Sequence, residues 1–521
     1  MVRIGSNYAR LLTTLIYGIA IVPLMAAWLG GDALGLYLFI VSQAGLAAIF
    51  HDIVLTSLVR ELAAAWHRQR DFRETCDAAM LVCVVVAFLV AVTFAVLWLV
   101  LPFLNISEAL LPAAQWMILL EGAFTIIYVL VAPAVTMYIA REEFILQNFF
   151  TVLRRSDFIV SLIVCSAVWP SIDAAEGLIR FMAVAIAIRV FAVLVAAVYM
   201  WIRDRSVLGR PWRASRERIV AIRSTFGWNT GVIVANNLHD RSGALLINIW
   251  FGLWGNTVFG LANRLVSYVR RLTTGMTFGI EAVGARLAEA SDEKASMKRM
   301  LHAVSRSHAL VAWPGVVITF VLADELIRLW LGRSLDDPDR YVSIAALLVR
   351  IGVFGLAARA ISDGWIFLLY GAGHIRRYAK VLFLGGLLNP VLAIVLILTL
   401  PDLGEDVSPA NNITGVSWAI TVAFVLFNGI LIPMRGAQIL ELQMRDFLVP
   451  LIPGLLLAVV LGPLLLLPDW IPGLREPGEL WGLLDLAISL AAYSLVYGIA
   501  AFFVLLNSEE RRRVRRLIPG L

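Results

Sequence analysis

Long apolar runs separated by short charged breaks limit this chain to few folds. Each run covers about 18 to 30 residues, and a helix of that length crosses a hydrocarbon layer about 30 Å thick. Hydrophobic residues make up 60% of the chain and charged residues 15%. The hydrophobic share exceeds that of soluble domains. The strict alternation of a membrane β-barrel is absent. The sequence therefore predicts an all-α, polytopic membrane protein.

Fourteen runs are predicted to span the membrane. The first is expected to be a retained helix, because it is too long for a signal peptide. The predicted spans cover residues 11–29, 34–59, 78–102, 110–138, 149–169, 177–202, 226–252, 257–284, 307–331, 340–370, 376–400, 412–433, 448–467 and 481–507.

The charges in the connections predict the orientation of the spans. Connections after even-numbered spans are rich in arginine, whereas those after odd-numbered spans are short and rich in acids. By the positive-inside rule the basic connections face the cytoplasm. Arginines also precede the first span and follow the last one, so both termini are expected in the cytoplasm. These terminal arginines are Arg3, Arg10, Arg511, Arg512, Arg513, Arg515 and Arg516. The net charge of +6 is therefore topological, and no nucleic acid partner is expected.

A weak repeat predicts two six-span lobes. Trp28-Leu29-Gly30 ends the first span, and Trp250-Phe251-Gly252 ends the seventh. A six-span period keeps both copies in the same orientation, which is a plan found in transporters. We expect an N-terminal lobe at 1–202, a cytoplasmic linker at 203–225, a C-terminal lobe at 226–433, and two added spans with a basic tail at 434–521.

The middle of the seventh span is unusually polar. The stretch VIVANNLHDRSGALLINIW contains Asn236, Asn237, His239, Asp240 and Arg241 near the middle of the bilayer. An Asp or Arg at a helix centre costs about 2.5 to 3.5 kcal/mol on insertion scales, so this face must look at protein or water. One interpretation is that Asp240 and Arg241 pair with charges on neighbouring helices. The other is that the face lines a transport cavity.

Further arginines at membrane depth favour the cavity. Arg189 lies in span six, Arg270 and Arg271 in span eight, and Arg350 and Arg359 in span ten. Guanidinium groups offer forked donors to phosphate oxygens and keep their charge in a low dielectric. We therefore expect an anionic, phosphate-bearing cargo. For Arg359, an ion pair with Asp363 one turn later is an equal alternative.

Few acids lie at this depth, and each is a candidate for binding a coupling proton or cation. Asp240 is the first choice, with Asp52 and Glu121 as further candidates, whereas Asp157 follows Arg154 and Arg155 and is expected to form an ion pair. No metal site or cofactor is expected, because the cysteines are scattered and no zinc motif, phosphate-binding glycine loop or nucleophile triad is visible. The cysteines are Cys76, Cys83 and Cys165.

Several short motifs, taken in order, resemble the polysaccharide (oligosaccharide-lipid) flippases of the MATE-like multidrug/oligosaccharidyl-lipid/polysaccharide exporter superfamily. The motifs are Leu29-Gly30 and Gly35-Leu36-Tyr37, Asp52 with Arg60, Asp240-Arg241, Gly252, Gly260-Leu261, Ala262-Asn263-Arg264-Leu265, Leu388-Asn389, and Gly415-Val416-Ser417-Trp418-Ala419. Each is weak alone, but their order and spacing extend over most of the chain.

The resemblance implies a V-shaped pair of six-helix lobes around a cationic cavity, to which Arg264 would contribute. Such a protein would move a polyprenyl-pyrophosphate-linked glycan from the inner to the outer leaflet of the bacterial cytoplasmic membrane by alternating access, as a transporter and not an enzyme. Its partners would be that lipid, a proton or sodium ion and the membrane, and a monomer is expected. Tyr268-Val269-Arg270-Arg271 is more charged than the family pattern, which implies a more basic pocket.

Two other functions compete with this one. A cation-coupled multidrug exporter of the same superfamily would require acidic cavity residues, and the arginine excess argues against it. A membrane glycosyltransferase or polymerase acting on polyprenyl phosphates is suggested by Asp336-Asp337 in an outer loop, but such enzymes need a larger outer domain. A scaffold or receptor would leave the charges at depth unexplained.

Overall fold

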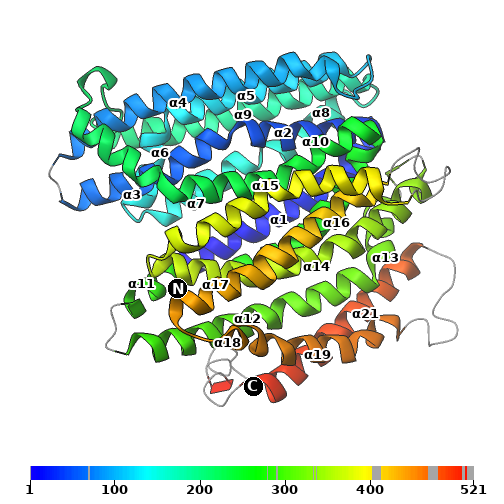
Figure 1. The fold of residues 1–521 in the computed structure, drawn as a ribbon. Coiled ribbons are helices and arrows are strands. Elements are labelled where there is room, and N and C mark those ends of the chain that lie inside the picture. The colour runs from blue at the N-terminus through cyan, green and yellow to red at the C-terminus, as the bar shows by residue number, and fades with distance from the viewer. Residues whose placement is uncertain are drawn as a thin grey trace.

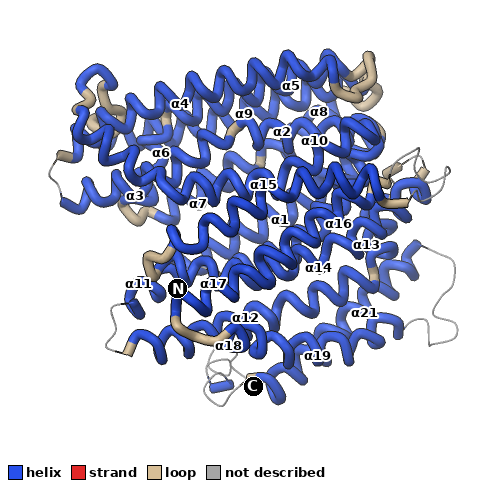
Figure 2. The backbone as a smooth tube through the Cα atoms, viewed as in Figure 1, coloured by secondary structure: helices blue, strands red, loops and turns tan. Residues whose placement is uncertain are grey.

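The computed structural model is built of helices (Figure 1; Figure 2) and describes residues 2–68, 71–277, 280–288, 292–332, 334–335, 337–401, 412–467, 479–506 and 511–512. Within these ranges there is no strand, and ten helices are long and apolar enough to cross a membrane, or eleven if one bent pair counts as a single span. The predicted class, an all-α protein with many membrane-length apolar helices, is confirmed. Asp336 and the tail residues Arg513, Arg515 and Arg516 lie outside the described residues.

The first half of the chain, up to residue 203, forms nine helices. They are α1 (Val2–Leu29), α2 (Gly31–Ala47), α3 (Ile49–Arg68), α4 (Phe72–Val100), α5 (Leu111–Leu130), α6 (Ala132–Ala140), α7 (Phe144–Arg155), α8 (Asp157–Val168) and α9 (Ala174–Arg203). Helices α2 and α3 are the bent pair, with 52° between them.

The second half begins with α10 (Arg216–Thr274). It continues with α11 (Ile280–Ala288), α12 (Glu293–Val321), α13 (Ala323–Leu331), α14 (Pro338–Gly371), α15 (Ile375–Thr399), α16 (Thr414–Ala423), the π-helical segment Phe424–Leu431, α17 (Ile432–Leu440), α18 (Met444–Leu448), α19 (Ile452–Leu461) and α21 (Glu479–Ala500). In Figure 1, α4, α5 and α9 lie along one side, α12, α19 and α21 along the other, and α1, α10 and α15 between them.

Helix α10 is a hairpin of two helices. The Asn256 side chain donates a hydrogen bond to the carbonyl of Ala244 at 2.8 Å, although twelve residues of continuous helix would separate these positions by about 18 Å. The reversal occurs at Gly252, whose φ of 63° and ψ of −156° are not helical. Asn248 joins the hairpin tip to the first half of the chain by accepting a hydrogen bond from the backbone amide of Asn105 at 3.1 Å.

Proline distorts α1 and frees a backbone acceptor. Pro23 has no amide hydrogen, so it cannot donate to the carbonyl of Ile19 one turn earlier. The indole nitrogen of Trp330 in α13 donates to this carbonyl instead, at 2.8 Å. The contact satisfies an exposed polar group in an apolar helix and ties the two halves of the chain together.

The basic linker between α9 and α10 is packed against the first half. Asp77 accepts a hydrogen bond from the backbone amide of Arg210, and a β-carbon at Gly209 would lie 2.2 Å from the carbonyl oxygen of Cys76. Burial favours the neutral form of Asp204, but hydrogen bonds from Ser206 and Arg141 hold the pKa of Asp204 below its usual value. The linker is therefore held by specific contacts.

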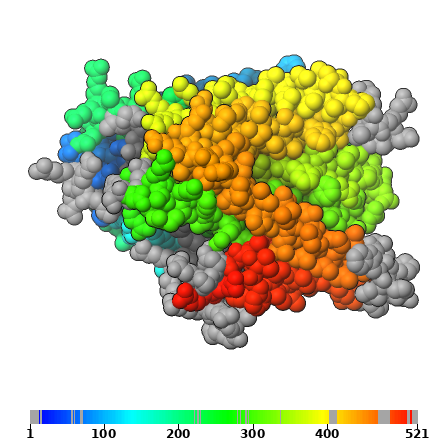
Figure 3. Space-filling view, turned by 60° about the horizontal axis from the view of Figure 1, so that its bottom comes forward, coloured from blue at the N-terminus to red at the C-terminus, as the bar shows by residue number. Residues whose placement is uncertain are grey.

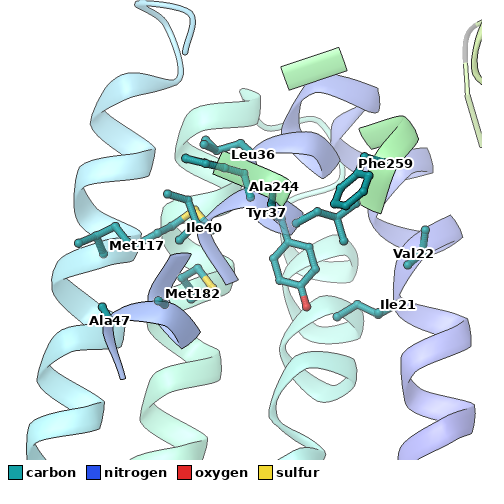
Figure 4. Close-up of a cluster of buried hydrophobic side chains, with 14 of the residues drawn as sticks. Ile21, Val22, Leu36, Tyr37, Ile40, Ala47, Met117, Met182, Ala244 and Phe259 are labelled. Carbon is teal, nitrogen blue, oxygen red and sulfur yellow. The ribbon is translucent and has the colours of Figure 1, made fainter. Parts of the chain in front are cut away.

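Apolar side chains form both the core and an outer belt. The largest cluster of buried apolar side chains draws its members from both halves of the chain, from Ile21 in α1 to Phe424 after α16. Figure 4 shows Tyr37 and Ile21 within it. Large apolar side chains are also exposed, such as Phe88 at 68% and Val504 at 71%, which suits a surface in contact with lipid. In the space-filling view the C-terminal helices lie at one edge of the molecule (Figure 3).

We predict that Gly252→Ala destabilises the protein by about 1 to 3 kcal/mol, because the backbone region at this turn is essentially restricted to glycine. Thermal unfolding of purified protein in detergent measures the effect. Gly498→Ala is the control, since this residue lies within helix α21 and no atom lies within 4 Å of the place where its β-carbon would stand. Equal melting temperatures for both variants would contradict the requirement for glycine at this turn.

Candidate functional site

A cavity lies between the first half of the chain and α10. Its volume is about 460 Å³, within the range of roughly 300 to 1,000 Å³ typical of small-molecule pockets. Helices α1, α2, α3, α5, α7, α8 and α9 line it from one side, and α10 lines it from the other. The α10 residues at the cavity are Arg241, Arg264, Tyr268 and Arg271.

Positive charge dominates the cavity wall. Six arginines line it, against two carboxylates, Glu121 and Asp157. The arginines are Arg154, Arg155, Arg189, Arg241, Arg264 and Arg271. Aromatic side chains are the other main component, namely Tyr17, Tyr37, Phe124, Tyr128, Phe158 and Tyr268.

Both carboxylates of the cavity belong to one buried cluster around Arg189. Its Nη1 lies 2.9 Å from Glu121, and its Nε donates to Asp157. The sequence suggested Arg154 or Arg155 as the partner of Asp157, whereas the structure assigns that role to Arg189. The Arg189 Nη2 has no hydrogen-bond partner among the described residues. Glu121 and Asp157 thus both pair with Arg189, and the arginines that α10 contributes to the cavity receive no ion pair from either carboxylate.

Arg241 crosses from α10 to α2. Its Nη1 donates to the carbonyl of Ser42 at 3.5 Å, and the Ser42 hydroxyl donates to the carbonyl of Arg241 at 3.4 Å. The guanidinium occupies the space where a side chain at Gly45 would stand, since a β-carbon there would lie 1.2 Å from Nη1. Arg241 therefore depends on a glycine in the opposite helix.

Aromatic rings support two other cavity arginines. Arg264 lies over the ring of Tyr37, 5.7 Å from its centroid, and donates to the carbonyl of Gly18 at 3.4 Å. Arg271 lies 5.3 Å from the ring centroid of Tyr268. Within the described residues neither guanidinium has a carboxylate partner. A cation on an aromatic face keeps its charge available to an incoming anion.

A second charged cluster lies in the second half, outside the cavity lining. Asp363 accepts from Arg270 at 2.8 Å and lies 3.1 Å from Arg359. Asp240 is 3.9 Å from Arg270, and Asn236 accepts from Arg359 at 2.7 Å. For Arg359, the ion pair with Asp363 that the sequence left open is present. Asp240 also pairs with a neighbouring helix, as one of the two interpretations expected.

The remaining candidates are dispersed. His239 is buried, with its ring 4.6 Å from that of Phe424, and Asn237 donates to the carbonyl of Ile233 in its own helix. Arg350 pairs with Asp324 away from the cavity. Asp52 lies beside His51, which lines the cavity.

Sequence reasoning missed several cavity residues. It named Arg154 and Arg155 only as the residues that precede Asp157, and it noted Tyr37 only within a motif. Both arginines stand at the end of α7, directly before the break at Ser156, and both line the cavity. Gly45 had no signal in the sequence, because its role depends on the approach of Arg241 from another helix.

The arrangement is that of a helical membrane protein with an arginine-lined cavity, and comparisons with known proteins show which folds it resembles. Residues 150–337 match the model of a family described as polysaccharide biosynthesis protein. No curated protein sequence gives a match.

Solved structures share the fold over nearly the whole chain. The lipid II flippase MurJ in an inward closed conformation is 12% identical, with a TM-score of 0.67, and the match covers 96% of this chain and 99% of that one. An inward-facing multidrug resistance MATE transporter of the MOP superfamily is 12% identical, with a TM-score of 0.58 and coverage of 86% and 95%. A Vibrio cholerae MATE transporter in the bent form is also 12% identical, with a TM-score of 0.53 and coverage of 86% and 100%. The predicted resemblance is confirmed at the level of the fold, and a family model for polysaccharide biosynthesis proteins matches part of the chain.

We predict that Arg189→Ala destabilises the protein by about 3 to 5 kcal/mol, because it leaves two buried carboxylates without their cation. The measurement is thermal unfolding together with the yield of monodisperse protein. The matched control is the triple variant Arg189→Met, Glu121→Gln and Asp157→Asn, which removes all three charges and should recover most of the stability. Wild-type stability of Arg189→Ala alone would show that the cluster is not structural.

Proposed function

We propose that this protein is a flippase that moves a polyprenyl-pyrophosphate-linked oligosaccharide from the inner to the outer leaflet of the bacterial cytoplasmic membrane. The observation that carries the proposal is the charge of the cavity: six arginines line it, and its two carboxylates are both engaged by Arg189. Guanidinium groups in a partly dehydrated cavity would replace water around a diphosphate while a lipid tail stays in the membrane.

The fold supports transport by alternating access. We propose fourteen crossings, since the α10 hairpin supplies two and consecutive shorter helices, such as α5 with α6 and α7 with α8, supply one each. In this proposal, 1–202 and 226–433 form two like-oriented lobes joined by the linker 203–225, residues 434–521 add two helices and a basic tail, and both termini are cytoplasmic. Rocking of the lobes would expose the cavity to each side in turn.

Among the predicted cargo-binding residues, Arg241, Arg264 and Arg271 are the ones we propose to contact the diphosphate. Arg154 and Arg155 join them because they line the same cavity. Arg189 lines the same cavity but pairs with Glu121 and Asp157, so we propose a structural role for it. For Arg270, Asn236, Asn237 and His239, which lie elsewhere on α10, we propose an indirect role through the second charged cluster. Arg350 pairs with Asp324, so we propose no contact with cargo for it.

For the coupling ion we propose Asp240. Its side chain is 48% exposed and lies only 3.9 Å from Arg270, whereas Glu121 is buried against Arg189. We propose it because a half-exposed carboxylate in a long ion pair is accessible to a cation. Asp52 would be the second candidate.

A multidrug exporter would share the fold, but the charge of the cavity opposes it. An apolar cation would enter next to several guanidinium groups, and like charges a few ångströms apart repel in a low dielectric. We therefore place the cargo among anions. We propose that the protein functions as a monomer without a cofactor.

We predict that Arg264→Ala and Arg271→Ala each slow flipping about 10- to 100-fold, because one hydrogen bond to a charged group contributes about 1.5 to 3 kcal/mol. The assay is translocation of a fluorescent polyprenyl diphosphate disaccharide in proteoliposomes. Arg180→Ala is the matched control, since Arg180 pairs with Glu176 at the surface. Wild-type flipping by both cavity variants, or efficient transport of a cationic dye by the wild type, would overturn the proposed function.

We predict that Asp240→Asn abolishes the response of flipping to an imposed sodium or proton gradient, because an amide cannot hold the cation. Flipping without a gradient should persist. The measurement compares initial rates in proteoliposomes with and without each gradient, and Glu108→Gln in an exposed loop is the control. An unchanged gradient response in Asp240→Asn would remove this residue from coupling.

A further inference from the structure

Helix α2 and the α10 hairpin form one continuous contact between the halves of the chain. We call it the α2–α10 seam and define it by four glycines: Gly31, Gly35 and Gly45 of α2, and Gly260 of α10. Thr257 donates to the carbonyl of Gly31 at 2.8 Å. A β-carbon at Gly35 would lie 2.3 Å from the carbonyl oxygen of Leu253, and one at Gly260 would lie 2.7 Å from Leu38. Small residues allow such close approach of helices in membranes.

The seam ends at the cavity with Arg241. Gly45, which lines the cavity, forms a notch that receives the Arg241 guanidinium. This group is held by the carbonyl of Ser42 at 3.5 Å, which is a weak hydrogen bond. No described carboxylate pairs with it. The guanidinium is therefore closely packed but weakly hydrogen-bonded, so a stronger acceptor can replace the Ser42 carbonyl as its partner.

We propose that Arg241 is a diphosphate-operated latch on the α2–α10 seam. In the absence of cargo, the guanidinium lies in the Gly45 notch and holds the seam closed at the end next to the cavity. A lipid-borne diphosphate in the cavity draws the guanidinium out of the notch, because a phosphate oxygen is a stronger acceptor than a distant backbone carbonyl. The seam then loses its contact at the cavity and opens from that end. This inference rests on the proposed function.

The latch explains how cargo can favour the opposite conformation. A ligand shifts a conformational equilibrium only if it binds the two states with different affinity. Cargo competes with the notch for the same guanidinium, so it binds more tightly to the state in which the seam is open. Gly45 is therefore a positioning residue: it touches no cargo and acts by setting where Arg241 rests.

The test measures the distance across the seam. Spin labels on Ser107→Cys and Ser343→Cys report the separation of the two halves, since both positions are exposed and the three native cysteines are buried. Double electron–electron resonance is recorded on full-length protein in nanodiscs, with and without inorganic pyrophosphate. Gly45→Ala is compared with Gly231→Ala, whose new methyl group would meet only Phe383 at 3.9 Å.

We expect the wild type and Gly231→Ala to show a short distance that lengthens with pyrophosphate. Gly45→Ala should show the long distance without ligand, its population rising several-fold, and should respond little to pyrophosphate. A wild-type distribution and response in Gly45→Ala would overturn the latch. If Gly45→Ala does not fold, Arg241→Gln leaves the notch empty and should show the same long distance, and a wild-type distance there would equally overturn it.

Two further measurements separate the latch from the proposed function. Calorimetry tests pyrophosphate binding directly: no binding by the wild type would overturn the proposed function, whereas binding with unchanged label distances would overturn the latch alone. Polyprenyl diphosphate in the nanodisc identifies the source of the anion. Lengthening at a lower concentration than with inorganic pyrophosphate supports a lipid headgroup, and an equal response would overturn the lipid-borne ligand.

Discussion

The central constraint on this protein is that every charge at membrane depth needs a partner or water. A charged side chain in hydrocarbon is costly, so arginines and acids there must be paired or face a hydrated space. The chain meets this requirement in two ways. Arg189 with Glu121 and Asp157, and Asp363 with Arg270 and Arg359, form compact clusters of opposite charge. The arginines that α10 contributes to the cavity lie along its wall, Arg241 against Gly45 and Arg264 over the ring of Tyr37.

The same constraint explains why the two halves meet where they do. Backbone groups exposed by irregular helices need donors, and the opposite half supplies them: Trp330 donates to Ile19 near Pro23, and Asn248 receives the amide of Asn105. Glycines in α2 let α10 come close enough for such contacts. The contact between the halves is therefore polar at selected points and closely packed where glycines of α2 meet α10.

The sequence predicted the class of fold well, because the length of an apolar run is set by the membrane itself. It also predicted arginines at depth, and Arg241, Arg264 and Arg271 do line the cavity. It could not predict which charges pair, because pairing depends on the rotation of each helix about its axis. Asp157 meets Arg189 from a helix further along the chain, and Arg350 faces Asp324 and not the cavity. The contact of Gly45 with Arg241 could not be predicted for the same reason.

The linker contacts have a mechanical consequence. A long, arginine-rich connection is usually expected to be flexible. Residues 204–215, however, are packed against the beginning of α4, through the hydrogen bond to Asp77 and the close contact of Gly209. The movement of the second half that we propose therefore has to begin after this fixed linker. Gly227, near the beginning of α10, departs from helical geometry, so we expect the chain to bend there and the fixed linker to limit the direction of the movement.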